Sequence, residues 1–368
     1  MKHIETHAYR LTSDCIWNSF HSSNKKHIII TGSRGSGKTT LLNKLFPTIL
    51  PGITTWAVPQ TGVYLKDNIT NESSQVGIYN PALEGYENKM ELIGNGFTTL
   101  GIQALHSALA SSSSWVSIDE IGYLESQCPD FLNMISQIMN HKHLLAVVRK
   151  QNLSHLTHLC QREDVFLIDL DASFQDVGCV IMASGLGKRF GKNKLMAEFH
   201  NKPLINYILD ATANIFTKRV VVTRHEAIAD LCKGKNVEVI LHSMPHRSDT
   251  IRLGLEHLLD TKHCMFCTAD QPLLKEDTIA ALALLAINAP QNIIRPIFED
   301  KPGSPVVFPQ SAYRELLQLP EGKGGGHVIK EHPDLIQYLP VDDKNELEDI
   351  DTPEDFLRLQ QLYENRIE

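Results

Sequence analysis

The sequence predicts an α/β protein of two domains, the first of them built on a mostly parallel sheet. The chain has 368 residues, which is more than one hydrophobic core usually organises. Apolar, strand-like runs alternate with helical stretches along both halves. Two glycine- and lysine-rich loops stand near the starts of the two halves, "GSRGSGKT" at Gly32–Thr39 and "ASGLGKRFGKNK" at Ala183–Lys194. Each half therefore has the features of a separate phosphate-binding domain.

The expected elements can be placed in order along the chain. In the first half a helix begins near Lys38, and strands are expected at His27–Thr31, Trp115–Glu120, His143–Val148 and in a run that ends at Asp171. The polar piece Ala172–Gly178 separates this half from a new strand. We therefore place an N-terminal extension at 1–26, a first domain at 27–172 and a second at 178–368. Further strands are expected near Cys179, Arg219, Val237, Cys264, Asn292 and Ser304.

The composition limits the partners and the compartment. The hydrophobic fraction is 42%, the charged fraction 21% and the formal net charge -8, which argues against a nucleic-acid or anionic-membrane surface. The start of the chain lacks a signal-peptide pattern, and the longest apolar run, Ile279–Ile287, is far shorter than a membrane span of about 20 residues. We therefore expect a cytoplasmic protein that binds neither nucleic acid nor membrane.

The cysteines suggest reduced thiols. They number seven, an odd count, and are scattered along the chain. The pattern "CMFC" at Cys264–Cys267 is more typical of a buried strand than of half a zinc or redox site, because no matching Cys or His pair stands at a ligand-like spacing.

The first loop satisfies the pattern G-x-x-x-x-G-K-[ST] between an apolar strand and a helix. Backbone N–H groups around Gly32, Gly35 and Gly37 can surround a β-phosphate, Lys38 can reach the β- and γ-phosphates, and Thr39 can ligate Mg²⁺. The strand "WVSIDE" delivers Asp119 toward that metal, and Glu120 can orient or deprotonate the attacking water. Arg149 and Lys150 follow another strand; they either stabilise the γ-phosphate or form a solvated basic pair.

These residues resemble a family of P-loop nucleoside-triphosphatases best known from thermophiles. The resemblance covers roughly His27–Asp171 and depends on "GSRGSGKTT", "IDEIGYLE" and "VVRK". It implies slow hydrolysis of ATP or GTP, with Lys38, Thr39, Asp119 and Glu120 at the family's motif positions. The segment Gly52–Phe97 is weaker in pattern, so the base preference stays open.

The second loop is not a P-loop, because it lacks G-K-[ST]. Its glycines, Gly185, Gly187 and Gly191, are interspersed with Lys188, Arg189 and Lys194, a pattern that suits a triphosphate attacked at its α-phosphorus. Carboxylates for Mg²⁺ come from separate segments: Asp270 ends a strand, and Asp349 and Asp351 alternate in an extended piece so that both point to one face. The following Thr352–Asp355 is typical of a helix start.

Together these residues resemble the nucleotidyltransferases with an A-A-G-x-[GS]-x-R-M-G loop, most closely the molybdenum-cofactor cytidylyltransferases. The matching segments run from about Gly178 to the C-terminus and include "MASGLGKRFGKNKL", "HRSDTIRLGL", "TADQPLL", "GSPVVF" and "DIDTPEDF". The resemblance implies a Rossmann-like (GT-A type) fold. It implies that Lys194 stabilises the α-phosphate, that Asp270 and Asp351 hold Mg²⁺ and that Gly303, Ser304 and Pro305 face the acceptor. The implied nucleotide-binding residues are Ala183, Ser184, Gly185, Gly187, Lys188 and Thr250. Arg189, which the resemblance implies holds the triphosphate, is expected to be catalytic together with Lys194.

Two departures from the family loop are Ser184 and Phe190. Ser184 lies where base choice is made in such loops, and the pair Ala183–Ser184 favours CTP over GTP. The segment "KGGGH" at Lys323–His327 is either a lid over the acceptor or an ordinary flexible turn.

The predicted reaction is Mg²⁺-dependent transfer of a cytidylyl group from CTP to molybdopterin, with or without its metal. Pyrophosphate leaves, and a separate domain hydrolyses ATP or GTP. One alternative is an NTP-driven maturation factor that delivers cofactor to a molybdenum hydroxylase. Another is transfer to a different phosphorylated acceptor, such as a sugar phosphate.

Overall fold

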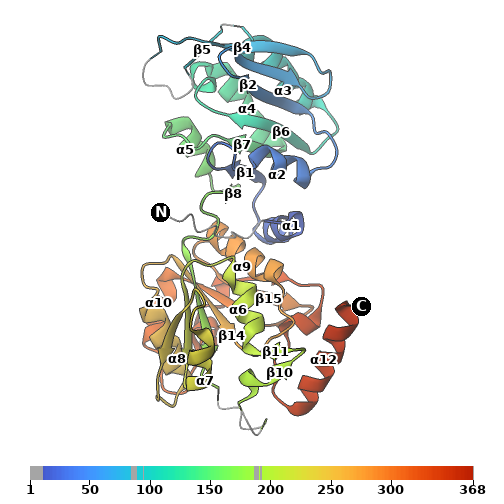
Figure 1. Ribbon diagram of the computed structural model, residues 1–368. Coiled ribbons are helices and arrows are strands. Elements are labelled where there is room, and N and C mark those ends of the chain that lie inside the picture. The colour runs from blue at the N-terminus through green and yellow to red at the C-terminus, as the bar shows by residue number, and fades with distance from the viewer. Residues whose placement is uncertain (1–10, 84–88, 94, 186–189, 191–192, 368) are drawn as a thin grey trace. The chain divides into compact units, whose positions relative to one another are not determined.

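The computed structural model describes residues 11–83, 89–93, 95–185, 190 and 193–367, and it divides into two compact units (Figure 1). Residues 24–173 form the first unit. Residues from 174 onward, together with the segment before residue 24, form the second. Among the described helices, none is long and apolar enough to cross a membrane.

The first unit is built on an eight-stranded sheet that contains all the predicted strands. Its order is β5-β4-β3-β2-β6-β7-β1-β8. The parallel part consists of β2 (Gly52–Val58), β6 (Trp115–Ile121), β7 (His143–Val148), β1 (His27–Thr31) and β8 (Val165–Asp169). β1 lies between two parallel neighbours and is buried along its whole length, which explains its uninterrupted apolar sequence.

An antiparallel extension at one edge accounts for the segment with the weak sequence pattern. It comprises β3 (Gly62–Asp67), β4 (Ser73–Tyr79) and β5 (Met90–Leu92), which continue the sheet from β2. The second half of β2 and both ends of β4 are exposed or half-buried. These strands therefore lack the continuous apolar runs that identify the parallel ones.

Helices cover the first sheet. They are α2 (Lys38–Leu45), α3 (Ile102–Ala110), α4 (Pro129–His141) and α5 (Ser154–Cys160), with short helices at Phe97–Gly101 and Glu125–Gln127. α4 buries Phe131, Ile135 and Ile138 on one face, and Phe131 packs against Phe97 at a ring distance of 5.0 Å. Residues that follow the carboxyl ends of β1, β6 and β7 line a cavity, which is described below.

The second unit has a mixed sheet in the order β13-β12-β9-β14-β17-β15-β16, with β18 paired to β15. Four strands run parallel: β13 (Glu238–Leu241), β12 (Arg219–Thr223), β9 (Val177–Ala183) and β14 (His263–Thr268). The rest are β17 (Val306–Pro309), β15 (Ile293–Phe298), β16 (Lys301–Pro302) and β18 (Ile336–Pro340), and β10 (Glu198–Phe199) and β11 (Lys202–Pro203) form a separate hairpin. Cys264 and Cys267 are buried free thiols within β14, as the strand prediction required.

The helices of this unit pack on the sheet or on each other. They are α6 (Ile205–Ala213), α7 (Glu226–Cys232), α8 (Arg247–Glu256), α9 (Glu276–Asn288), α10 (Tyr313–Leu317), α11 (Gly326–Glu331) and α12 (Pro353–Ile367). Short helices lie at Lys194–Met196, Gln310–Ala312, Pro333–Leu335 and Lys344–Leu347. α8, α10 and α11 share a core with β9, β12 and β14, which includes Val180, Val222 and Phe266.

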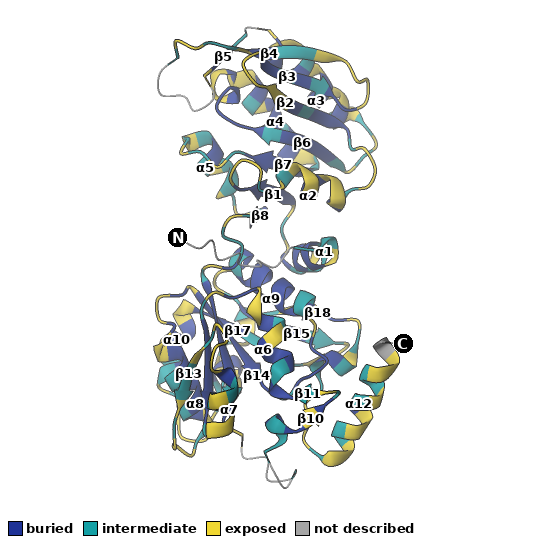
Figure 2. Cartoon of the chain, viewed as in Figure 1, coloured by how far each residue is buried: buried dark blue, intermediate teal, exposed yellow. Residues whose placement is uncertain are grey.

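The segment expected to be an N-terminal extension is part of the second unit. Helix α1 (Ser13–Ser22) packs on α9, and the Ser19 hydroxyl donates to the Ala281 carbonyl at 3.0 Å. Every residue of α9 from 278 to 286 is buried (Figure 2). The sequence did not predict this packing, because α1 and α9 are more than 250 residues apart along the chain.

Candidate active sites

The first loop surrounds the amino end of α2. Gly37 precedes this helix with a φ angle of 94°, in the left-handed region that favours glycine. The Lys38 ammonium donates to the carbonyl oxygens of Gly32, at 3.0 Å, and Ser33, at 2.7 Å. Gly35, which lies between Ser33 and Lys38 in the sequence, also has a positive φ angle. Free N–H groups at a helix start and a lysine on the same loop form a cradle for phosphate oxygens.

The end of β6 brings an acidic group to this cradle. The Thr39 hydroxyl, in the first turn of α2, donates to Asp119 Oδ1 at 3.1 Å. Burial raises the pKa of the Asp119 carboxyl to about 6, although the Thr39 hydrogen bond opposes the shift. A hydroxyl and a carboxylate in contact beside a phosphate cradle are hard oxygen ligands of the kind that Mg²⁺ uses.

Glu120 reaches the site because the strand is irregular at this residue. The pairing of β6 with β7 shifts between Asp119 and Ile121, and Glu120 has a φ angle of 86°. A bulge of this kind turns a side chain out of the regular alternation. The Glu120 carboxylate then accepts a hydrogen bond from Arg149 Nε at 2.5 Å.

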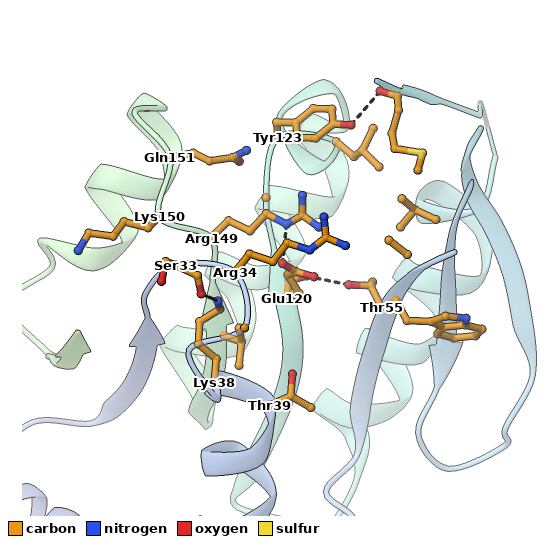
Figure 3. A pocket seen from close by; sticks show the side chains of 18 of the residues that line it. Ser33, Arg34, Lys38, Thr39, Thr55, Glu120, Tyr123, Arg149, Lys150 and Gln151 are labelled. Carbon is orange, nitrogen blue, oxygen red and sulfur yellow. Dashed lines mark hydrogen bonds and ion pairs between the residues drawn. The ribbon is translucent and has the colours of Figure 1, made fainter. Parts of the chain in front are cut away.

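A cavity of about 860 Å³ lies over these groups (Figure 3). Arg34 and Arg149 both line the cavity, and in the view of Figure 3 their side chains lie above Glu120, with Lys38 and Thr39 below. The remaining wall is partly aromatic and includes Trp56, Tyr79 and Tyr123. Arg34 was not among the predicted site residues, although its place inside the glycine loop makes it a candidate for phosphate contact.

Lys150 has a different role from Arg149. It pairs with Asp169 at 2.7 Å and Asp171 at 3.3 Å. Asp171 accepts hydrogen bonds from the Ser33 backbone N–H, at 2.8 Å, and from its hydroxyl, also at 2.8 Å. The structure thus links Lys150 to the loop through Asp171, a residue that the sequence analysis had used only as a strand end.

In the second unit, Lys194 lies at the centre of the candidate site. Its ammonium is 2.7 Å from Asp270 Oδ2 and 3.2 Å from Asp351 Oδ1, and it donates to the Ile350 carbonyl at 2.5 Å. Burial lowers the pKa of Lys194, and the two carboxylates raise it more, so the net shift is upward. The lysine is therefore held in its charged form between two separate chain segments.

Asp349 completes a group of three carboxylates around this lysine. Burial raises the pKa of the Asp349 carboxyl to about 7, and the nearby Asp270 and Asp351 add to the shift. Asp270 Oδ1 is buried and has no hydrogen-bond partner. An orphaned carboxylate oxygen among like charges fits a divalent cation.

The carboxylates are not yet arranged as a closed metal site. Within the described ranges, no three His, Cys, Asp or Glu side chains are grouped closely enough to hold a metal ion by themselves, so phosphate oxygens of the nucleotide would have to supply further ligands. Lys194 instead contacts both Asp270 and Asp351.

The first residues of the second loop are fixed by side chains from neighbouring strand ends. Ala183 ends β9, and the buried Ser184 hydroxyl donates to the Val222 carbonyl at 3.1 Å and contacts His242 Nε2 at 2.8 Å. Arg224 donates to the Ser184 carbonyl at 3.0 Å, and His225 bonds the Gly185 carbonyl at 2.9 Å. Gly187, Lys188, Arg189 and Gly191 lie outside the described residues.

Arg224, His225 and His242, which contact the start of the loop, were not among the predicted site residues. Each directly follows or nearly follows the carboxyl end of β12 or β13. Because ligands of open α/β sheets bind at the carboxyl ends of strands, polar residues at those ends were an available signal.

The remaining predicted residues lie on two other elements. Thr250 is buried in α8. Gly303, Ser304 and Pro305 form the turn before β17, where the Gly303 carbonyl accepts a hydrogen bond from Arg295 at 3.2 Å. The Gly303 Cα faces Leu347 so closely that an added Cβ would lie 2.9 Å from Leu347 Cδ1. Leu347 in turn receives a hydrogen bond from Gln271, next to Asp270. The turn is therefore close to the carboxylate group.

Comparison with protein families identifies the two halves separately. Residues 27–178 match the family described as NTPase. Residues 179–335 match the family described as MobA-like NTP transferase domain. These matches agree with the resemblance of each half that its motifs had indicated.

Individual relatives are distant. Molybdenum cofactor cytidylyltransferase of Escherichia coli is 20% identical over 195 residues, which covers 51% of this chain and 97% of that protein. Nucleoside-triphosphatase THEP1 of Thermotoga petrophila is 24% identical over 164 residues, which covers 40% of this chain and 86% of that protein. Among solved structures, molybdopterin-guanine dinucleotide biosynthesis protein A of Archaeoglobus fulgidus has a TM-score of 0.42 at 23% identity, covering 51% of this chain and 99% of that one.

Proposed function

Because the chain joins an NTPase domain to a MobA-like NTP transferase domain, we propose that it transfers a cytidylyl group from CTP to molybdopterin. The attached NTPase domain hydrolyses ATP or GTP. The observation that carries the transferase proposal is the Lys194 ammonium among three carboxylates at the end of the glycine loop.

The transfer step needs positioning and charge neutralisation rather than covalent catalysis. An oxygen of the acceptor phosphate forms a bond to the α-phosphorus of CTP. The bond from that phosphorus to the bridging oxygen breaks, and pyrophosphate leaves with the electron pair. Lys194 neutralises the charge that develops on the α-phosphate. Asp270, Asp349 and Asp351 would hold Mg²⁺, which supplies Lewis-acid charge to phosphate oxygens.

The choice of CTP rests on Ser184 and on one relative. The Ser184 side chain is fixed by Val222 and His242 at the start of the loop. The Escherichia coli relative, of which this chain covers 97%, is named as a cytidylyltransferase. Ser184 stands at the loop position where the family resemblance places the choice of base.

In the NTPase domain the proposed roles follow the contacts. Lys38 and the loop N–H groups bind the phosphates, and Thr39 and Asp119 would hold Mg²⁺. Glu120 orients the attacking water. Arg149 holds Glu120 in place and would stabilise the charge that develops on the γ-phosphate.

The proposed transfer is tested by pyrophosphate release from the full chain with Mg²⁺ and each of CTP, GTP, ATP and UTP, with and without molybdopterin. We expect release only with CTP plus molybdopterin, together with a cytosine dinucleotide product. Lys194→Ala should lower the rate by about 10² to 10³, whereas Lys301→Ala, at an exposed lysine of the same unit, should not. Release with GTP instead of CTP would replace the cytidylyl proposal with a guanylyl one. No release with any nucleotide would refute transfer to molybdopterin.

A further inference from the structure

The cavity over the first loop extends past the groups that hold phosphate. Its volume is about 860 Å³, and its phosphate-binding part is made by the loop after β1 with Lys38 and Thr39. Another part is lined by residues of β2 to β5 and of the loop after β6, which have no role in hydrolysis as described above. We call it the distal compartment, and the residues that define it are Trp56, Val63, Tyr79, Met90, Tyr123 and Leu124.

The strand order places the distal compartment on the far side of Glu120 from the phosphate loop. The loop follows β1, and the sheet continues from β1 through β7 to β6, which carries Glu120, and then through β2, β3 and β4 to β5. Because neighbouring strands lie about 4.8 Å apart, β6 is about 10 Å from β1, and β4 is about 14 Å further along the sheet. In the view of Figure 3 the Glu120 side chain accordingly lies between Lys38 and Tyr123.

The distal compartment opens on the attacking side of the γ-phosphate. In phosphoryl transfer the attacking and leaving oxygens lie roughly in line on opposite sides of the phosphorus. With Glu120 beside the attacking water, the leaving β-phosphate lies toward the loop and Lys38. The base of the bound nucleotide is joined through the α-phosphate and therefore also lies on the leaving side. The distal compartment is thus free for a second molecule.

Glu120 has a carboxylate oxygen available to such a molecule. Its Oε1 accepts the hydrogen bond from Arg149, and within the described ranges its Oε2 has no hydrogen-bond partner. The Glu120 side chain is 28% exposed, so a ligand in the cavity can reach it. A carboxylate placed in this way can take a proton from a hydroxyl as well as from water.

The walls of the distal compartment suit a flat ring. Trp56 is 38% exposed, and it stacks on Tyr64 with the ring centroids 5.6 Å apart and 19° between the ring planes. This contact holds the indole in one orientation. Tyr79 adds a second, half-buried aromatic side chain. Attack by water does not need an aromatic surface, whereas a planar ring is bound by stacking on one.

The charges of the cavity lie near the phosphate loop. In the described lining the cations are Arg34, Lys38, Arg149 and Lys150, from the loop and from the segment after β7. Between β2 and β5 and in the loop after β6, the described lining contains no Lys, Arg or His. A molecule that carried its own phosphate would lack a counter-charge there. The occupant should therefore be uncharged.

We propose that the first unit also transfers the γ-phosphoryl group to the hydroxyl of a nucleoside, which binds in the distal compartment in place of the attacking water. A nucleoside combines a flat ring, hydroxyl groups and the absence of charge. Its hydroxyl oxygen forms a bond to the γ-phosphorus, the bond from that phosphorus to the β–γ bridging oxygen breaks, and the nucleoside diphosphate leaves with the electron pair. The hydroxyl proton passes to Glu120. The proposal rests on the proposed function of this unit for the phosphate site and for the role of Glu120.

The test separates transfer to an alcohol from transfer to water. The full chain is incubated with Mg²⁺, γ-labelled ATP or GTP and, in separate samples, adenosine, guanosine, cytidine or uridine. Chromatography then resolves labelled nucleoside monophosphate from labelled inorganic phosphate. The variants are Trp56→Ala, Trp56→Phe, which keeps an aromatic ring, and Tyr79→Ala. The control is Ile78→Ala, at an exposed residue that adjoins Tyr79 and lies outside the cavity lining.

We expect labelled monophosphate from at least one of the four nucleosides. Trp56→Ala and Tyr79→Ala should each raise KM for that nucleoside by about tenfold, since each removes a stacking surface. Trp56→Phe should restore most of the loss, and Ile78→Ala should change nothing. In all variants KM for the triphosphate, and its hydrolysis without nucleoside, should stay within about twofold of wild type, because the phosphate site is intact.

Three outcomes would decide between the two activities. Inorganic phosphate as the sole labelled product with all four nucleosides would overturn the proposal and leave the proposed hydrolysis standing. A raised KM for the triphosphate in Trp56→Ala, with an unchanged KM for the nucleoside, would also overturn it, because Trp56 would then bind the base of the triphosphate. Transfer to a nucleoside without any release of inorganic phosphate would support it and refute the proposed hydrolysis.

Discussion

Glu120 is the residue on which hydrolysis in the first unit should depend. Its carboxylate is turned toward the nucleotide loop by the bulge in β6 and is held by Arg149. We expect Glu120→Gln to lower kcat for ATP or GTP hydrolysis by about 10² to 10⁴, the usual contribution of a positioned base. Nucleotide affinity should stay nearly the same, because Lys38 and the loop are unchanged.

Steady-state phosphate release and equilibrium nucleotide binding would check this prediction together. Glu163→Gln, at an exposed glutamate of the same unit, is the matched control and should hydrolyse normally. An unchanged kcat in Glu120→Gln would assign the water-positioning role to another group.

A second glutamate in this region should make stability depend on pH. Glu125 is buried and accepts a hydrogen bond from the Gly122 N–H at 2.8 Å. Burial raises the pKa of its carboxyl to about 7 from an ordinary value of 4.5. Between these two pKa values the folded state binds the Glu125 proton more tightly than the unfolded state does. The protonated Glu125 therefore adds to the free energy of unfolding at low pH, and this contribution is lost as the pH rises through about 7.

Glu125→Gln removes this titration with little change of shape. Relative to the variant, the wild type should therefore lose free energy of unfolding on the order of 3 kcal/mol between pH 4.5 and pH 7. Urea denaturation at several pH values, followed by tryptophan fluorescence, measures the difference; Trp56 and Trp115 both lie in this unit. A constant difference across this range would show that Glu125 is ionised throughout.

At the scale of single residues, the sequence led more readily to candidate residues than to their contacts. Asp119, Glu120, Lys194 and Asp270 were predicted as site residues from their places at loop and strand ends. Their partners were harder to identify, because the contact of Arg149 with Glu120 depends on a one-residue bulge. A bulge has no reliable sequence pattern when the strand is otherwise apolar.

Among the elements, α1 should stabilise the second unit although it precedes the first in sequence. Phe20 of α1 is buried, α1 packs on α9 and β18, and Ser19 bonds α9 directly. We expect Phe20→Ala to cost about 3 to 5 kcal/mol of unfolding free energy, the usual range for a buried phenylalanine. Asp14→Asn, at an exposed position of the same helix, should cost little.

The measurement is thermal inactivation of the two activities in one sample. Phe20→Ala should lower the temperature at which transfer is lost and leave that of NTP hydrolysis unchanged. Equal lowering of both would mean that α1 supports the whole chain, and no lowering of either would mean that its contact with α9 is dispensable.

The elements that could be predicted from the sequence are the ones that are buried. The strands β1, β6, β7 and β14 are continuous apolar runs, and the sequence predicts each of them within a residue or two. The hairpins from β2 to β5 are half-exposed, and their residues such as Gln60 and Asn71 mark turns without fixing a sheet. The packing of α1 on α9 depends on contacts between residues such as Ser19 and Ala281, which no local pattern specifies.

For the whole molecule, the two phosphate loops belong to separate units, each with its own sheet and its own charged groups. Such an arrangement predicts that the two reactions can be removed one at a time. Lys38→Ala takes away the cation of the first loop, so NTP hydrolysis should fall at least about a hundredfold, while cytidylyl transfer continues. Asp270→Asn removes a charge beside Lys194, so transfer should fall similarly while hydrolysis continues.

Both rates should be measured on the same preparations, as inorganic phosphate from ATP or GTP and as pyrophosphate from CTP with molybdopterin. The Asp→Asn substitution keeps the shape of the buried side chain. A loss of transfer would therefore be due to the loss of the Asp270 negative charge, which pairs with Lys194 and would help to hold Mg²⁺. If either variant lost both activities while remaining folded, the two nucleotide reactions would be coupled, and hydrolysis in the first unit would have to be a step of the transfer cycle.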